Sequence, residues 1–212
     1  KIIDIDCKFK DPFKINKKIR SKFVLNSLNY GHKIALDKKN ITGVINCPID
    51  KKLLNKDNFG VTEYYTSKCN IKDNSVAMLI YNKNLAVSPI TTHIDIKNIS
   101  KNINIRSIVN QIKTIAKWYI SNHRVKPKIA VLGLNPHNAE NKNNTEEAKV
   151  ILPSIAKLKK LKININGPFA ADTFFIHDFK NFDVIIGMYH DQVLSPFKAL
   201  FKFDAINITL GL

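Results

Sequence analysis

Residues 105–137 read IRSIVNQIKTIAKWYISNHRVKPKIAVLGLNPH. In the first part, apolar residues recur at helical spacing and predict an amphipathic helix over about 105–122. These residues are Ile108, Ile112, Ile115 and Tyr119. The apolar run 129–134 then predicts a buried strand, and His137 follows it. A helix that leads into a buried strand is a building unit of α/β folds.

The same alternation continues on both sides of this stretch. Apolar runs predict strands at 41–47, 76–81, 85–90, 184–188 and 205–210. Helical patterns cover about 13–29, 153–160 and 192–201, and Asn144 with Glu147 has the spacing of a helix start. We therefore expect an α/β fold with a mostly parallel sheet flanked by helices. No repeat or long linker marks a boundary inside residues 1–212.

Composition indicates an ordinary globular protein. The chain has 212 residues, of which 44% are hydrophobic. It contains neither an apolar run long enough to span a membrane nor an N-terminal signal-peptide pattern. Cys7, Cys47 and Cys69 form no CxxC pair, which favours reduced thiols. We expect a cytoplasmic protein with no membrane partner.

The net charge of +17 suggests nucleic-acid binding at first sight. The lysines, however, are spread along the whole chain among many asparagine and isoleucine residues and do not form one stripe. We expect no nucleic-acid partner and regard such a protein as a distant alternative. A positive field would still attract a phosphate-bearing substrate.

Three histidines each follow a predicted strand, in short motifs at 91–93 (TTH), 134–137 (LNPH) and 188–192 (MYHDQ). Ligands in open α/β sheets bind beyond the carboxyl ends of strands. If His93, His137 and His190 converge there, three imidazoles form a divalent-metal site with room for a substrate. The residues alone leave structural histidines equally open, and imidazole does not specify the metal.

Other polar residues near these motifs have a functional and a structural reading. Asp191 could orient an imidazole or cap a helix, and Asp172 could have either role as well. Lys198 could hold a phosphate or lie in solvent, whereas Asn207, inside an apolar strand, is expected to be buried with partners. No GxGxxG or GxxxxGK[ST] motif is present, which argues against a standard Rossmann site and against a P-loop but leaves another type of dinucleotide site open.

Taken together, the motifs resemble those of the 4-hydroxythreonine-4-phosphate dehydrogenase family of pyridoxal 5′-phosphate biosynthesis. The resemblance runs in order along most of the chain. Its blocks are 47–51 (CPIDK), 62–64 (TEY), 91–93 (TTH), 132–137 (LGLNPH), 145–147 (TEE), 167–173 (GPFAADT), 188–192 (MYHDQ) and 207–212 (NITLGL).

The resemblance implies a fold like that of the isocitrate and isopropylmalate dehydrogenases. It implies a homodimer whose active site is shared between the chains, with His190 drawn from the partner chain. The metal ligands would be His93, His137 and His190, and the substrate-binding residues Thr62, Lys198 and Asn207.

The implied cofactors are NAD and one divalent ion (zinc, magnesium or cobalt). No residue is assigned to NAD. The implied reaction oxidises and decarboxylates 4-phosphooxy-L-threonine to 3-amino-2-oxopropyl phosphate.

The chain departs from the family pattern at several places. Val61 replaces a substrate-contacting histidine, the glycines after Asn-Pro-His are lost, and Val193 replaces a glycine. We expect residues 1–212 to be the core of a two-lobed dehydrogenase and a fragment that lacks the family's terminal segments. Two alternatives remain open: a paralogue that acts on a related acid such as a phosphothreonate or phosphoerythronate, and an eroded, inactive relative.

Overall fold

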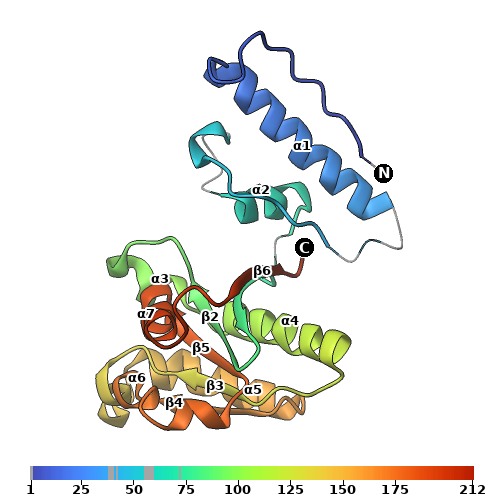
Figure 1. Ribbon diagram of the computed structural model, residues 1–212. Helices are drawn as coiled ribbons and strands as arrows, with labels where there is room; N and C mark the ends of the chain where they lie inside the picture. Colours follow the sequence, from blue (N-terminus) through green and yellow to red (C-terminus); the bar gives the residue numbers. More distant parts are fainter. Residues whose placement is uncertain (1, 38–40, 42, 55–59, 72) are drawn as a thin grey trace. The chain divides into compact units, whose positions relative to one another are not determined.

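The computed structural model describes residues 2–37, 41, 43–54, 60–71 and 73–212 (Figure 1). The chain divides into two compact units, Lys1–Asn70 and Ile71–Leu212. The boundary, which the sequence left open, directly follows Cys69 and Asn70 at the end of helix α2 (Val61–Lys68). None of the helices in the described part of the chain is long and apolar enough to cross a membrane.

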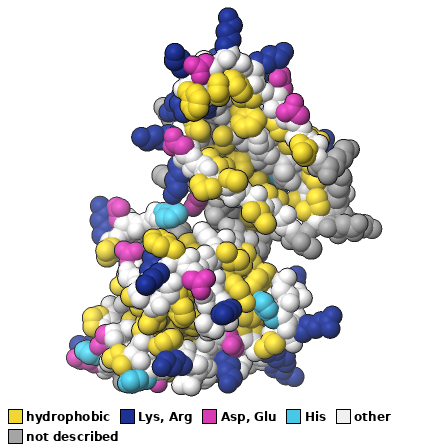
Figure 2. All heavy atoms as spheres, viewed as in Figure 1, with side chains coloured by type: hydrophobic (Ala, Val, Ile, Leu, Met, Phe, Trp, Pro, Cys, Tyr) yellow, Lys and Arg dark blue, Asp and Glu magenta, His cyan; other side chains and the backbone are white. Residues whose placement is uncertain are grey.

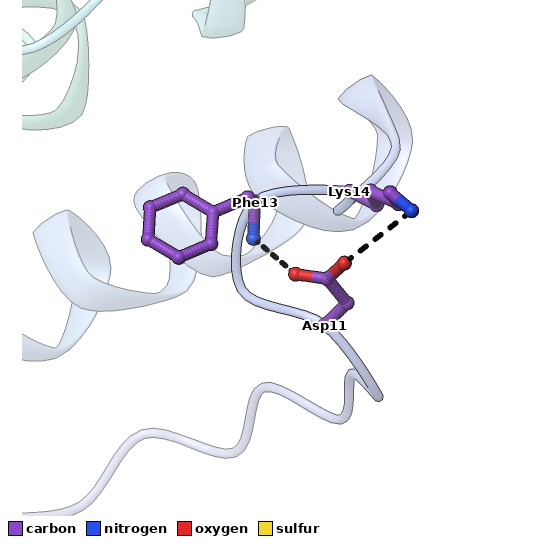
Figure 3. A network of polar contacts seen from close by, with 3 residues as sticks. All are labelled: Asp11, Phe13 and Lys14. Carbon is purple, nitrogen blue, oxygen red and sulfur yellow. Dashed lines mark hydrogen bonds and ion pairs between the residues drawn. The ribbon is translucent and has the colours of Figure 1, made fainter.

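The first unit is built around helix α1 (Lys17–Asp37). A turn precedes the helix, in which the Asp11 carboxylate accepts a hydrogen bond from the Phe13 backbone N–H and pairs with Lys14 (Figure 3). The Asn16 side chain then accepts a hydrogen bond from the Ile19 N–H at 2.9 Å, as an N-cap does. The turn and the cap explain why the helix begins later than the predicted position 13.

A small core joins α1, the turn η1 (Lys51–Leu53) and α2. Leu28, Leu54, Tyr64 and Tyr65 are its buried members. The Tyr64 hydroxyl donates a hydrogen bond to the Asn29 side chain at 3.1 Å. The strand predicted at 41–47 is wrong, because none of its described residues is in a strand and Ile45 is fully exposed. Apolar composition favours a strand only where a neighbouring strand supplies hydrogen bonds, and the described strands all belong to the second unit.

The second unit contains a six-stranded sheet in the order β4-β3-β5-β2-β1-β6. The strands are β1 (Ala77–Asn82), β2 (Leu85–Thr91), β3 (Ile129–Leu132), β4 (Ile165–Phe169), β5 (Val184–Tyr189) and β6 (Ile206–Leu210). The first four strands in this order are parallel, whereas β1 runs antiparallel to both of its neighbours. Five of the six strands were predicted, and the mostly parallel sheet is confirmed.

Helices cover both faces of this sheet (Figure 1). On one face, α4 (Ile105–His123) and α5 (Leu152–Lys160) share a core with Val131 and Ile186. On the other face, α6 (Ala171–Phe174) and α7 (His190–Phe201) pack on Ala130 and Ile185. Adjacent residues of β3 and β5 therefore point into different cores, as expected for strands that are buried on both faces.

Helix α4 confirms the periodicity read from the sequence. Ile108, Ile112 and Ile115 are fully buried, and Tyr119 is nearly so. The Asn104 side chain accepts a hydrogen bond from the Ser107 N–H and caps the start of the helix. Among the described residues, the unit also contains four short helical segments, η2 (Ile96–Asn98), α3 (Ile99–Asn102), η3 (Pro136–Asn141) and η5 (Asp178–Asn181), and one π-helix, η4 (Glu147–Ile151).

Strand β4 is the strand that the sequence did not predict. Its residues alternate less clearly, and Gly167 and Pro168 lie inside it. Gly167 has φ 132°, and a Cβ there would lie 2.3 Å from the Val131 carbonyl oxygen. The close approach of β4 to β3 therefore requires glycine at this position.

Candidate functional site

The three motif histidines follow three neighbouring parallel strands. His93 lies two residues beyond β2, His190 directly follows β5, and His137 comes five residues after β3. Because β5 lies between β3 and β2 in the sheet, all three histidines belong to segments that leave the same edge. This edge is where open α/β sheets bind ligands.

Two of these histidines are close neighbours. The rings of His93 and His190 have centroids 6.0 Å apart, at an interplanar angle of 42°. Both line a small pocket of about 170 Å³, together with Thr92, Ile94, Ile96, Ile99, Tyr189 and Asp191. His93 is exposed and His190 is partly buried, so both rings are accessible from this pocket. We expected His190 to stand apart from the other two histidines within one chain. The structure contradicts this for His93, which lies beside His190.

Asp191 contacts the imidazole of its neighbour. Its Oδ1 lies 2.7 Å from His190 Nδ1. The N-cap of α7 is Tyr189, so Asp191 occupies the first turn and does not cap the helix. A carboxylate at Nδ1 favours the tautomer in which Nδ1 carries the proton, which leaves a lone pair on Nε2.

His137 lies on a segment of unusual backbone. Residues 137–140 of η3 all have positive φ values near 50°. His137 Nδ1 is 4.0 Å from Asp172 Oδ2, and both side chains are largely exposed. Asp172 follows the N-cap residue of α6, Ala170, and does not cap that helix. Within the described ranges of one chain, histidine, cysteine and acidic side chains form no group of three that could hold a metal ion.

Buried and partly buried hydrogen bonds fix the strand ends that carry these motifs. The Thr91 hydroxyl donates to the Met188 carbonyl at 2.7 Å and joins β2 to β5. Gln192 accepts a hydrogen bond from the Met188 N–H at 2.7 Å and donates one to the Gly133 carbonyl, also at 2.7 Å. It thereby links the end of β5 to the end of β3. Sequence reasoning assigned no role to Gln192 or Thr91, since only the fold identifies their partners.

A buried carboxylate holds the segment that leads to His137. Glu147, which is 3% exposed, accepts hydrogen bonds from the backbone N–H groups of Leu134 and Asn135 at 2.8 and 2.7 Å. Its other oxygen accepts one from the Asn135 side chain at 2.9 Å. Burial raises the pKa of Glu147, but these hydrogen bonds outweigh it, so the pKa lies below its ordinary value. Glu147 is thus held as a carboxylate.

The predicted substrate-binding residues lie on three different elements. Thr62 is in α2 of the first unit, where its carbonyl accepts a hydrogen bond from the Thr66 hydroxyl at 2.8 Å. Lys198 is exposed on α7, two helical turns beyond Asp191. Asn207 lies on the edge strand β6 and is exposed, so the expected burial of its amide is wrong. Neither Lys198 nor Asn207 lines the pocket beside His93 and His190.

Comparison with known proteins gives a consistent result. The family model of pyridoxal phosphate biosynthetic protein PdxA matches residues 1–212. The 4-hydroxythreonine-4-phosphate dehydrogenase of Sulfurihydrogenibium sp. (strain YO3AOP1) is 36% identical over 216 residues, which cover 100% of this chain and 65% of that protein. The enzyme of the same name from Aquifex aeolicus (strain VF5) is 37% identical over 177 residues, or 82% of this chain and 54% of that protein.

A solved structure agrees with the fold. The crystal structure of 4-hydroxythreonine-4-phosphate dehydrogenase from Klebsiella pneumoniae superposes with a TM-score of 0.84 at 27% identity, over 98% of this chain and 66% of that one. The predicted α/β fold of the isocitrate and isopropylmalate dehydrogenase type is thereby confirmed. The chain spans about half to two thirds of the length of these relatives. With a matching family model over its whole length and relatives more than 30% identical, the chain belongs to the PdxA family of pyridoxal phosphate biosynthetic proteins.

Proposed function

We propose that this chain forms part of an NAD- and metal-dependent dehydrogenase that oxidises and decarboxylates 4-phosphooxy-L-threonine. The observation that supports this proposal most directly is the His93–His190 pair at neighbouring strand ends, with Asp191 on the Nδ1 atom of His190. Membership of the PdxA family supports a role in pyridoxal phosphate biosynthesis. The relatives from Sulfurihydrogenibium and Aquifex are named 4-hydroxythreonine-4-phosphate dehydrogenase, and this name supports the same substrate and a dehydrogenase activity.

The histidine pair fits a divalent ion. Two imidazoles that coordinate one zinc ion at about 2.0–2.1 Å have ring centres roughly 5–6 Å apart. The rings of His93 and His190 are 6.0 Å apart, close to that range. The Asp191 contact suits a ligand that uses Nε2, since metal-binding histidines donate their other ring N–H to such partners. Imidazole donors suit zinc or cobalt and do not exclude magnesium.

His137 completes the site from a second copy of the chain. Within one chain it forms no group of three with the other two histidines among the described residues. It is exposed, on a segment that leaves the same sheet edge. In the homodimer, His93 and His190 of one subunit and His137 of the partner subunit would share one ion, and Asp172 would orient His137.

The bound ion would supply Lewis acidity, which favours loss of a proton from a hydroxyl group and stabilises negative charge as it develops. The protein's own groups position the substrate around it. Asp191 holds the His190 ring in one tautomer and orientation. Lys198 would offer an ammonium group to the substrate phosphate, and Asn207 a further polar contact. Thr62, in the first unit, is the third substrate-binding residue that we propose from the family resemblance.

The proposed reaction has two stages, an oxidation and a decarboxylation. In the first, the substrate's C3 carbon would lose a hydride, for which NAD⁺ is the proposed acceptor, and its hydroxyl would lose a proton to solvent, which leaves a β-keto acid. The carboxylate then leaves as carbon dioxide, and protonation of the remaining carbon gives 3-amino-2-oxopropyl phosphate. NAD, when bound, would supply the hydride acceptor, whereas the protein contributes geometry and charge. We place the enzyme in the cytoplasm.

The valine at position 61 favours a second candidate function. Val61 begins α2 and packs in the small core of the first unit, where the family carries a histidine. A valine cannot donate a hydrogen bond to a substrate, which favours a paralogue that acts on a phosphothreonate or phosphoerythronate. Turnover of these acids faster than of 4-phosphooxy-L-threonine would decide for the paralogue.

The test uses the full-length protein, with NADH production and bound metal as separate readouts. His93→Ala and His190→Ala should each abolish NADH production and lower zinc or cobalt affinity by at least about 10-fold. His177→Ala, which alters an exposed histidine outside the three motifs, should leave both readouts unchanged. Full metal affinity in both site variants would refute the proposal.

A further inference from the structure

We infer that Glu147 is a positioning residue for the metal site, because it fixes the segment that carries His137. This inference rests on the proposed function. Glu147 lies at the start of the π-helix η4, ten residues after His137, and does not line the pocket at the histidine pair. Its carboxylate instead holds the backbone of the turn that leads from β3 to His137.

The Glu147 carboxylate holds the turn through three hydrogen bonds, which we call the Glu147 clamp. Both backbone N–H groups of the turn, at Leu134 and Asn135, donate to the same carboxylate oxygen. The second oxygen accepts from the Asn135 side-chain amide. Three hydrogen bonds to a buried charged group are strong individually and hold the turn in one geometry. The side chain is 3% exposed, so water cannot readily replace it.

His137 depends on this turn because its own exposed side chain does little to hold the segment in place. Its side chain is 71% exposed, and the backbone from residue 137 to residue 140 is left-handed. Such backbone is unfavourable for residues other than glycine and persists only where its surroundings impose it. The Glu147 clamp lies at the start of the segment, directly before Pro136. The Asn138 side chain, which donates to the Pro168 carbonyl at 3.1 Å, holds it on the other side.

The neighbouring Glu146 provides a matched control. It contacts the Asn135 side chain at 2.9 Å and the Ser100 hydroxyl, but no backbone N–H of the turn. Glu146→Gln therefore makes the same chemical change one residue away and leaves the backbone clamp in place. Glu147→Gln keeps the size of the side chain but replaces one acceptor oxygen with an NH₂ group, which cannot accept a hydrogen bond.

The experiment measures binding of cobalt(II) alone to the metal-free, full-length protein, by titration and by the cobalt visible spectrum. Thermal unfolding of each variant verifies that it is folded. We expect Glu147→Gln to weaken cobalt binding by about 10–100-fold, as loss of a ligand-orienting partner does. Glu146→Gln should change it by less than about 3-fold. If Glu147→Gln does not fold, Glu147→Asp, which shortens the clamp by one methylene, takes its place.

A double-mutant cycle separates positioning from general stability. If Glu147 acts through His137, adding Glu147→Gln to His137→Ala should weaken cobalt binding no further, because the ligand is already gone. Additive losses would mean that Glu147 acts elsewhere and would overturn the inference. So would unchanged cobalt affinity in Glu147→Gln while His137→Ala weakens binding. If His93→Ala and His137→Ala both bind cobalt normally, the proposed function itself fails.

Discussion

Gln192 connects the ends of two strands that carry the candidate site, and its removal should be costly. Gln192→Ala deletes an acceptor for the Met188 N–H and a donor to the Gly133 carbonyl, each at 2.7 Å. Met188 is fully buried and Gly133 is buried as well. Alanine offers neither group a partner.

The expected loss follows from the two groups left unpaired. A buried donor or acceptor without a partner costs about 1–3 kcal/mol. Gln192 is only partly buried, so water can reach part of the space that it leaves. We therefore expect Gln192→Ala to lower the free energy of unfolding by about 2–4 kcal/mol.

Equilibrium urea unfolding of the full-length protein measures this change, and hydrogen exchange at the Met188 amide localises it. Asn122→Ala is the matched control, because Asn122 is an exposed amide whose side chain donates a hydrogen bond to the Trp118 carbonyl of its own helix. It should change the free energy of unfolding by less than about 0.5 kcal/mol. A loss below about 0.5 kcal/mol in Gln192→Ala, with unchanged exchange at Met188, would refute the reasoning.

Three further predictions test other contacts around the strand ends. Thr91→Val keeps the shape of the side chain but removes the bond to Met188, and should cost about 1 kcal/mol in urea unfolding; no loss would mean that this bond contributes nothing. Gly133→Ala places a Cβ 2.1 Å from the Asn138 side-chain oxygen and should cost about 1–3 kcal/mol by calorimetry, whereas wild-type stability would contradict that close contact. The lowered pKa of Glu147 contributes stability above its unfolded value of about 4.3, and this stability is lost as the pH falls through the folded value. Acidification from about pH 5 should therefore destabilise the wild type more steeply than Glu147→Gln, and parallel pH profiles would contradict this reasoning.

The charge of the chain is distributed, as its sequence indicated. Figure 2 shows lysine and arginine side chains scattered over the visible face, among acidic and apolar groups. A distributed positive field attracts anions without specifying where they bind. Individual side chains at a binding site would have to select a phosphate, so the number of lysines in the chain carries little functional information.

Much of the second unit could be predicted from local patterns alone. Helix α4 follows from the spacing of Ile108, Ile112 and Ile115, and its prediction is accurate to one residue at each end. Buried parallel strands read as continuous apolar runs, so β3 and β5 were recognisable as well. Placement of the histidine motifs after strands followed from the same patterns. The spacing of apolar residues indicates whether an element is a helix or a strand and which of its faces is apolar. That information was enough to predict these elements.

The tertiary structure decided which elements are neighbours. Strand order in the sheet brings His190 beside His93, and no pattern within either motif encodes that order. Asn207 was expected to be buried because its strand is apolar, but an edge strand such as β6 has only one neighbour. Hydrogen bonds between residues far apart in sequence, such as that of Gln192 to Gly133, exist only once the sheet has formed. The sequence by itself determined the elements and the chemical groups at their ends, whereas long-range pairing determined which of those groups meet.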